Sequence, residues 1–251
     1  MSGVHLRHWP GDPDRPGLAL HPMMGSGAVF DRMAAALGGR LDLRGFDMPG
    51  HGKSDPWLGG EIDYHTAVTR IAAAMIERPL DLIGHSMGAT VALRIAVAAP
   101  EAVRSLTLIE PVLFAAAPDT AQDALDARLA VLLAEGRAAE AAAEFLAAWG
   151  LPGMRLGPEA ASQIRLVAET APALREDSAN ILRPGGLEAI EAPVLLIQGA
   201  ESPPVIRAIA DALAERLADV GRATVPGAAH MLPLTHPAEV AGLVGVNLDR
   251  A

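Results

Sequence analysis

A serine and a histidine of this chain occupy segments that suit nucleophilic chemistry. Ser86 is the central residue of Gly-His-Ser-Met-Gly at 84–88, which follows an apolar run at 80–83 and precedes small residues typical of a helix start. A serine in such a strained strand-to-helix turn is exposed for attack, and the flanking glycines let two backbones approach where a Cβ would clash. The pattern predicts Ser86 as a nucleophile, with a purely structural tight turn as the alternative.

A serine hydroxyl is a poor nucleophile until a base takes its proton, and His230 is placed to be that base. It follows the Pro-Gly-Ala-Ala turn at 226–229, between the last predicted strand and the last predicted helix. This loop lies at the carboxyl ends of the strands, where open α/β sheets build their sites. A buried structural histidine is the alternative. Three other histidines are explained as turn, supporting or helix-start residues: His51, His85 and His236.

The elements that position these residues alternate between short apolar runs and helical patterns, as expected for strands and crossover helices of a mostly parallel sheet. The predicted strands are 17–21, 41–47, 80–84, 105–109, 193–198 and 223–226. The predicted helices, with apolar residues at helical spacing, are 28–37, 64–77, 87–98, 204–217 and 237–248. The sequence therefore predicts an α/β fold with a mostly parallel central sheet flanked by helices.

One long interval, at about 114–187, breaks this alternation with Ala-rich helical sequence. Connections between sheet elements are usually only a few residues long, so a segment of this size is expected to have its own structure and a role such as a lid. We predict one domain over 1–251 with this interval as a helical cap insertion, because a chain of 251 residues that is 51% hydrophobic can bury a substantial core.

The serine motif, the Asp-Met-Pro-Gly-His-Gly-Lys-Ser turn at 47–54 and His230 together resemble the α/β-hydrolase superfamily, in its esterase, lipase and haloperoxidase-like branch. The resemblance covers 17–110 and 192–248 and lapses across the insertion, where such proteins carry a variable cap. It implies the α/β-hydrolase fold and a serine hydrolase.

The resemblance also implies an oxyanion hole made by two backbone amides, one after the nucleophile and one in the loop after an early strand. On this sequence these are the amides of Met87 and Met23, with methionine side chains lining the acyl pocket. The sequence departs from the family at Pro22, because a glycine commonly follows the histidine that corresponds to His21.

The sequence also departs from the family's pattern at the position of the triad acid. Related hydrolases usually supply an aspartate after the strand at 193–198, but Ser202 stands there. Some members of the superfamily take the acid from the end of the strand after the nucleophile helix, which here ends at Glu110. We therefore predict Glu110 as the acid that orients the histidine, with Glu201 as the alternative.

The resemblance implies hydrolysis of a carboxylic ester, or a related acyl bond, of a small to medium apolar substrate through an acyl-enzyme. Serine at position 86 excludes the aspartate nucleophile of haloalkane dehalogenases and epoxide hydrolases. A C–C bond hydrolase, a lactonase, a perhydrolase and a non-catalytic ligand-binding member remain as alternatives.

Composition excludes several other classes of function. The net charge is −10 without a basic run, so we expect no nucleic-acid partner. The chain has no cysteine for a thiolate zinc site, and the histidines match no common zinc spacing, so we expect no metal. The Gly-Ser-Gly at 25–27 lacks the rest of a nucleotide-binding loop, so we expect no cofactor. We expect a cytoplasmic protein without a membrane span, because neither a signal-like start nor a long apolar stretch is present.

Overall fold

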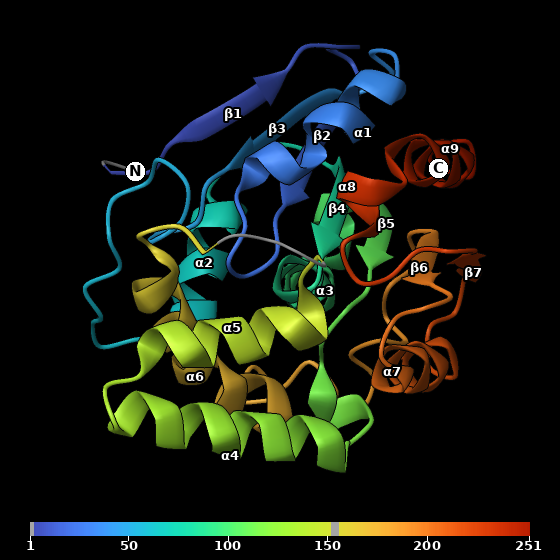
Figure 1. The fold of residues 1–251 in the computed structure, drawn as a ribbon. Helices are drawn as coiled ribbons and strands as arrows, with labels where there is room; N and C mark the ends of the chain where they lie inside the picture. Colours follow the sequence, from blue (N-terminus) through green and yellow to red (C-terminus); the bar gives the residue numbers. More distant parts are fainter. Residues whose placement is uncertain (1–2, 152–155) are drawn as a thin grey trace.

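A seven-stranded sheet forms the centre of the computed structural model, which describes residues 3–151 and 156–251 (Figure 1). The strand order is β1-β3-β2-β4-β5-β6-β7, and each pair is parallel except β1 with β3. The strands are β1 (Leu6–Trp9), β2 (Pro16–Leu20), β3 (Asp42–Phe46), β4 (Leu80–His85), β5 (Val103–Ile109), β6 (Val194–Gly199) and β7 (Val220–Val225). The predicted mostly parallel sheet flanked by helices is confirmed.

Helices cover both faces of the sheet because neighbouring strand residues point to opposite sides. Leu82 of β4 packs in the apolar cluster on one face, and the next residue, Ile83, packs in the cluster on the other. The first face carries α2 (Tyr64–Ala73), α3 (Met87–Ala98) and α7 (Pro204–Ala214), and the second carries α1 (Asp31–Ala36) and α9 (Pro237–Leu248). Short helices complete the connections: η1 (Gly27–Phe30), η2 (Pro100–Ala102), η3 (Phe114–Ala116) and α8 (Leu232–Thr235).

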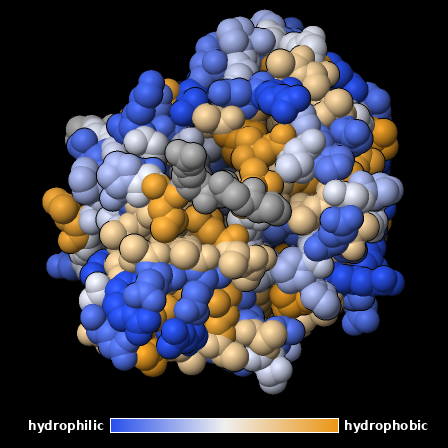
Figure 2. Space-filling model, viewed as in Figure 1, coloured by the Kyte–Doolittle hydropathy of each residue, from blue (hydrophilic) through white to orange (hydrophobic). Residues whose placement is uncertain are grey.

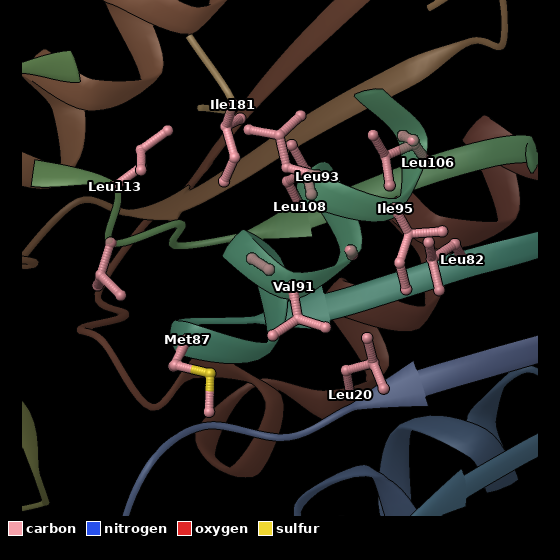
Figure 3. Packing of buried hydrophobic residues seen from close by; sticks show 14 of the residues in the cluster. Leu20, Leu82, Met87, Val91, Leu93, Ile95, Leu106, Leu108, Leu113 and Ile181 are labelled. Atoms are coloured by element: carbon pink, nitrogen blue, oxygen red, sulfur yellow. The ribbon is translucent and has the colours of Figure 1, made fainter. Parts of the chain in front are cut away.

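The helix after Ser86 packs into the larger apolar cluster of the core. Figure 3 shows Val91 of α3 near Leu20 of β2, and Leu93 of α3 beside Leu108 of β5. All four side chains are fully buried. Truncating a buried leucine to alanine typically costs about 2–5 kcal/mol of stability, so this packing fixes the start of α3 firmly against the sheet.

Between η3 and β6, the described part of the insertion contains the helices α4 (Thr120–Ala134), α5 (Ala138–Trp149) and α6 (Ala160–Glu176), and residues 152–155 lie outside the described part. They share a small apolar cluster that includes Leu132, Ala142 and Ile164. The Asp119 carboxylate caps α4 by accepting from the Gln122 amide at 2.8 Å. The three helices lie together on one side of the sheet (Figure 1).

Two differences from the predicted elements have local causes. Strand β1 was not predicted, because it is a four-residue edge strand whose side chains remain partly or largely exposed and so lack a strong apolar pattern. Helix α2 ends at Ala73 instead of 77, because the chain tightens there: the Met75 and Ile76 amides donate to carbonyls only three residues back.

Candidate active site

Ser86 stands in a strained turn between β4 and α3. Its backbone has φ 57° and ψ −120°, outside the regions that side chains readily adopt. A Cβ at Gly84 would lie 2.5 Å from the Ala89 Cα, and one at Gly88 would lie 2.1 Å from the Leu20 carbonyl oxygen. Both glycines are therefore required by backbone contacts, and they let the turn present the serine hydroxyl at the carboxyl edge of the sheet.

His230 lies between Ser86 and Glu110. Its Nε2 is 2.9 Å from the Ser86 Oγ, and its Nδ1 is 2.9 Å from Oε2 of Glu110. An ionised carboxylate only accepts hydrogen bonds, so Nδ1 donates to Glu110 and Nε2 accepts from the serine hydroxyl. The His85 Nε2 donates to the His230 backbone oxygen at 2.8 Å and so fixes the loop. These are the geometric relations that nucleophile, base and acid require.

Glu110 follows β5 directly and is fully buried, with φ 50°. Its Oε1 accepts from the Gly199 amide and from the Ser202 hydroxyl, each at 2.6 Å. Ser202, at the position where an aspartate was expected, thus donates a hydrogen bond to the predicted acid, Glu110. The alternative acid, Glu201, is exposed, and its amide bonds to the Ala228 carbonyl.

Backbone strain gathers at this edge of the sheet. Among the described residues, five non-glycine residues have positive φ, and three of them are Met24, Ser86 and Glu110. Each such conformation costs about 1–3 kcal/mol and persists only where the surroundings enforce it. The enforcing contacts are the tight glycine turn at Ser86 and the two hydrogen bonds to Glu110.

Two buried histidines hold the loop that follows β2. His51 Nε2 accepts from the Met24 amide at 3.1 Å, and His21 Nε2 accepts from the Met48 amide at 2.8 Å. Burial lowers the pKa of His21 to about 3 and that of His51 to about 4. Both rings are therefore neutral at physiological pH, which leaves one ring nitrogen of each free to accept.

The amides of Met23 and Met87 are the two predicted oxyanion donors. Within the described residues, neither amide donates a hydrogen bond to another protein group. Both methionines line the same pocket as Ser86 and His230. A ligand oxygen bound beside Ser86 therefore has backbone donors to approach.

The pocket beside Ser86 lies between the sheet edge and the insertion. Its lining is mostly apolar and comes largely from the insertion, including Phe114, Phe145 and Leu174. The Trp149 ring meets the His230 ring edge to face, with centroids 4.7 Å apart. On the face seen in Figure 2, hydrophobic surface gathers near the middle, among hydrophilic side chains. The pocket suits an apolar group bound next to the serine.

Residues 3–151 and 156–251 contain neither a cluster of metal-binding side chains nor a membrane-spanning helix. No group of three or more histidine, aspartate or glutamate side chains is arranged to hold a metal ion. None of the helices in these ranges has the length and apolar character needed to cross a membrane.

A mostly parallel sheet with a strained serine, a histidine and a carboxylate at its carboxyl edge is the arrangement of α/β-type hydrolases. The pattern of the alpha/beta hydrolase family matches residues 16–243, and the chain belongs to that family.

Relatives and solved structures agree with this assignment. A 2-(acetamidomethylene)succinate hydrolase from Mesorhizobium japonicum is 30% identical over 239 residues, covering 88% of this chain and 83% of that protein. A pimeloyl-(acyl-carrier protein) methyl ester esterase from Nitrosomonas europaea is 30% identical over 109 residues, 43% of this chain and 41% of that protein. The carboxylesterase structure from Bacillus subtilis superimposes with a TM-score of 0.69 at 20% identity, covering 99% of this chain and 88% of that one. These similarities support a hydrolase of the α/β type.

Proposed function

We propose that this hydrolase cleaves carboxylic esters through an acyl-enzyme, with Ser86 as nucleophile, His230 as general base and acid, and Glu110 as the triad carboxylate. The proposal rests on one observation: a continuous chain of hydrogen-bond contacts from the Ser86 hydroxyl through His230 to a buried carboxylate. A histidine in a purely structural role has no need to approach a strained serine with one nitrogen and a carboxylate with the other.

The mechanism follows from this geometry. Ser86 Oγ attacks the ester carbonyl carbon while its proton passes to His230 Nε2, 2.9 Å away. Glu110 stabilises the imidazolium that forms, and the amides of Met87 and Met23 donate to the tetrahedral oxyanion. His230 then protonates the leaving alkoxide, which leaves the acyl group on Ser86. Water attacks that ester with His230 again taking the proton, and the collapse of the second tetrahedral intermediate frees Ser86.

The substrate class follows from the pocket and from the relatives. The mostly apolar walls beside Ser86 suit an apolar acyl group, for which we propose a small to medium size. One relative is a methyl ester esterase, and a structural neighbour is a carboxylesterase. We therefore favour ester hydrolysis and propose that the helices α4 to α6 act as the cap over the acyl group.

The experiment is hydrolysis of p-nitrophenyl butyrate and hexanoate by the wild type and by Ser86→Ala. We expect kcat to fall by about 10⁵–10⁶-fold in Ser86→Ala, because the covalent step is lost. Ser178→Ala removes an exposed serine hydroxyl and serves as the control, with unchanged kcat. A folded Ser86→Ala protein with wild-type turnover would contradict the proposal.

A further inference from the structure

The pocket beside Ser86 has one charged group in its mostly apolar wall. Asp126 of α4 lines this pocket, and its side chain is only 7% exposed. Its Oδ1 accepts from Gln122 Nε2 at 2.8 Å. Within the described residues, the buried Oδ2 has no hydrogen-bond partner. Arg175 Nη1 lies 3.6 Å from Oδ2, which is within ion-pair range but too far for a hydrogen bond.

A buried carboxylate oxygen that accepts no hydrogen bond is unfavourable for the folded state. Burial raises the pKa of Asp126, and it outweighs the opposing effects of the Gln122 hydrogen bond and the Arg175 charge. A buried acceptor without a donor typically costs about 1–3 kcal/mol, whereas an apolar side chain at this place would add to the insertion's core. A ligand that donates a hydrogen bond to Oδ2 would explain why a carboxylate occupies this buried position.

The position of Asp126 relative to the serine is fixed by contacts between buried side chains. Gln122, which holds Oδ1, accepts through its own Oε1 from Trp149 Nε1 at 3.2 Å. Trp149 in turn packs its ring against His230. Asp126 is therefore tied, through Gln122 and Trp149, to the base beside Ser86.

The charges around Asp126 indicate which kind of donor fits. Arg175 Nη1 also lies 3.6 Å from Oδ1 of Asp123, so one guanidinium already faces two carboxylates. A second cation at Oδ2 would stand close to this guanidinium and be repelled by it. A neutral hydroxyl or amide N–H satisfies Oδ2 without that repulsion.

We propose that Asp126 is a specificity-determining residue, whose Oδ2 accepts a hydrogen bond from a neutral donor on the acyl group of the substrate. This inference rests on the proposed function and narrows it: the preferred substrates are esters of acids with a hydroxyl or amide N–H away from the reacting carbonyl. The apolar wall contacts the methylenes between the reacting carbonyl and the polar group. Asp126 accepts the hydrogen bond from that polar group.

The test compares p-nitrophenyl esters that differ only at the polar group. The wild type is assayed with β-hydroxybutyryl, ω-hydroxyhexanoyl and ω-hydroxyoctanoyl esters, each beside its methyl ether, which cannot donate. An ω-aminohexanoyl ester supplies the cationic comparison. We expect kcat/KM for the best hydroxyl ester to exceed that for its methyl ether by about tenfold or more, as for a hydrogen bond to a charged acceptor. The amino ester should be poorer than the hydroxyl ester.

Asp126→Leu should bring the hydroxyl-to-ether ratio of kcat/KM close to one, whatever happens to the absolute rates. Asp126→Asn keeps the shape, serves if the leucine variant does not fold, and should lower the ratio at least threefold. Asp123→Asn is the matched control, since Asp123 shares the Arg175 contact but is exposed and does not line the pocket. It should keep the wild-type ratio.

The outcomes separate the inference from the proposed function. Equal kcat/KM for hydroxyl and ether esters at every chain length, in a wild type that needs Ser86, overturns the role of Asp126 and leaves the serine mechanism standing. A ratio that survives Asp126→Leu also overturns it, and so does a preference for the amino ester. No hydrolysis of any ester contradicts the proposed function and removes the basis of this inference with it.

Discussion

Two buried carboxylates, one at the edge of the sheet and one in the insertion, differ in how many of their oxygens accept hydrogen bonds from the protein. Glu110 contacts His230 through Oε2, and its Oε1 accepts from Gly199 and Ser202. Asp126 has a partner for Oδ1 alone. Both side chains are at least nine-tenths buried, so exposure to solvent does not account for the difference.

The Glu110 carboxylate is already oriented by protein donors, whereas the Asp126 carboxylate still has one oxygen that can accept a hydrogen bond from a ligand. Every contact of Glu110 comes from the protein, as expected of a group that must hold a histidine in one tautomer through the whole reaction. Asp126 lines the pocket beside Ser86 and keeps one oxygen without a hydrogen bond, as expected of a group whose partner arrives with the substrate. The sheet edge would then supply the chemistry and the insertion the selectivity.

The largest effect is expected at Glu110. Glu110→Gln keeps the size of the side chain but removes the charge that stabilises the imidazolium, so kcat should fall by about 10³–10⁴-fold. Ester hydrolysis with purified, folded protein measures this. Glu201→Gln, an exposed neighbour, should change kcat less than twofold. The reverse order of effects would assign the acid to Glu201.

Moving the acid should restore part of the lost activity. The Ser202 hydroxyl lies 2.6 Å from Oε1 of Glu110, so an aspartate at 202 places a carboxylate near the position that the glutamate occupies. We expect Glu110→Gln/Ser202→Asp to exceed Glu110→Gln in kcat by about tenfold or more, since part of the charge stabilisation returns. A double variant no better than the single one would show that the acid functions only from the end of β5.

A smaller effect is expected when Glu110 loses one of its donors. Ser202→Ala removes the Ser202 hydrogen bond to Glu110 but leaves the Gly199 amide in place, so kcat should fall by about tenfold, with KM nearly unchanged. Ser202→Thr keeps a hydroxyl and should recover most of the rate. Equal losses in both variants would assign Ser202 a packing role instead of a positioning role.

The smallest effect concerns stability in the insertion. Asp126→Asn removes a buried charge whose Oδ2 accepts no hydrogen bond and whose burial outweighs the contact with Arg175, so Tm at pH 7 should rise by about 2–4 °C. Because the folded-state pKa of Asp126 is raised, its protonated form favours the folded protein at low pH, and this benefit is lost as pH rises through that pKa. The gain should therefore be larger at pH 7 than at pH 4. A rise in Tm of the same size at both pH values would contradict the statement that the ionised form of Asp126 destabilises the folded protein.

The parts of the site that depend on neighbouring sequence were predictable. The run from β4 through Ser86 into α3 is continuous in the chain, and the glycine spacing follows from backbone contacts within a few residues. Helix α3 begins and ends where predicted, at Met87 and Ala98. The boundaries of β2 to β6 were also close, because most of these strands are short apolar runs bounded by turn residues. Strand β7 begins at Val220, three residues before the predicted start, because glycine and polar residues interrupt its apolar pattern.

The parts that depend on distant contacts were only partly predictable. Glu110 reaches Ser202 because β5 pairs with β6 in a register that aligns Ile109 with Ile197, and no local pattern encodes that register. Asp126 lies in a helix beside Asp123 and has the sequence character of a solvated face. Its burial arises only when α4 packs against the rest of the insertion and the pocket beside Ser86.

The proposed mechanism requires Ser86 to be the activated nucleophile, and covalent labelling tests this directly. The wild type, Ser86→Ala and Glu110→Gln are treated with a fluorophosphonate, digested and analysed by mass spectrometry. We predict a single adduct on Ser86 in the wild type, slower formation of the same adduct in Glu110→Gln, and none in Ser86→Ala. Labelling of a different residue, or equal labelling of Ser86→Ala, would contradict the central claim.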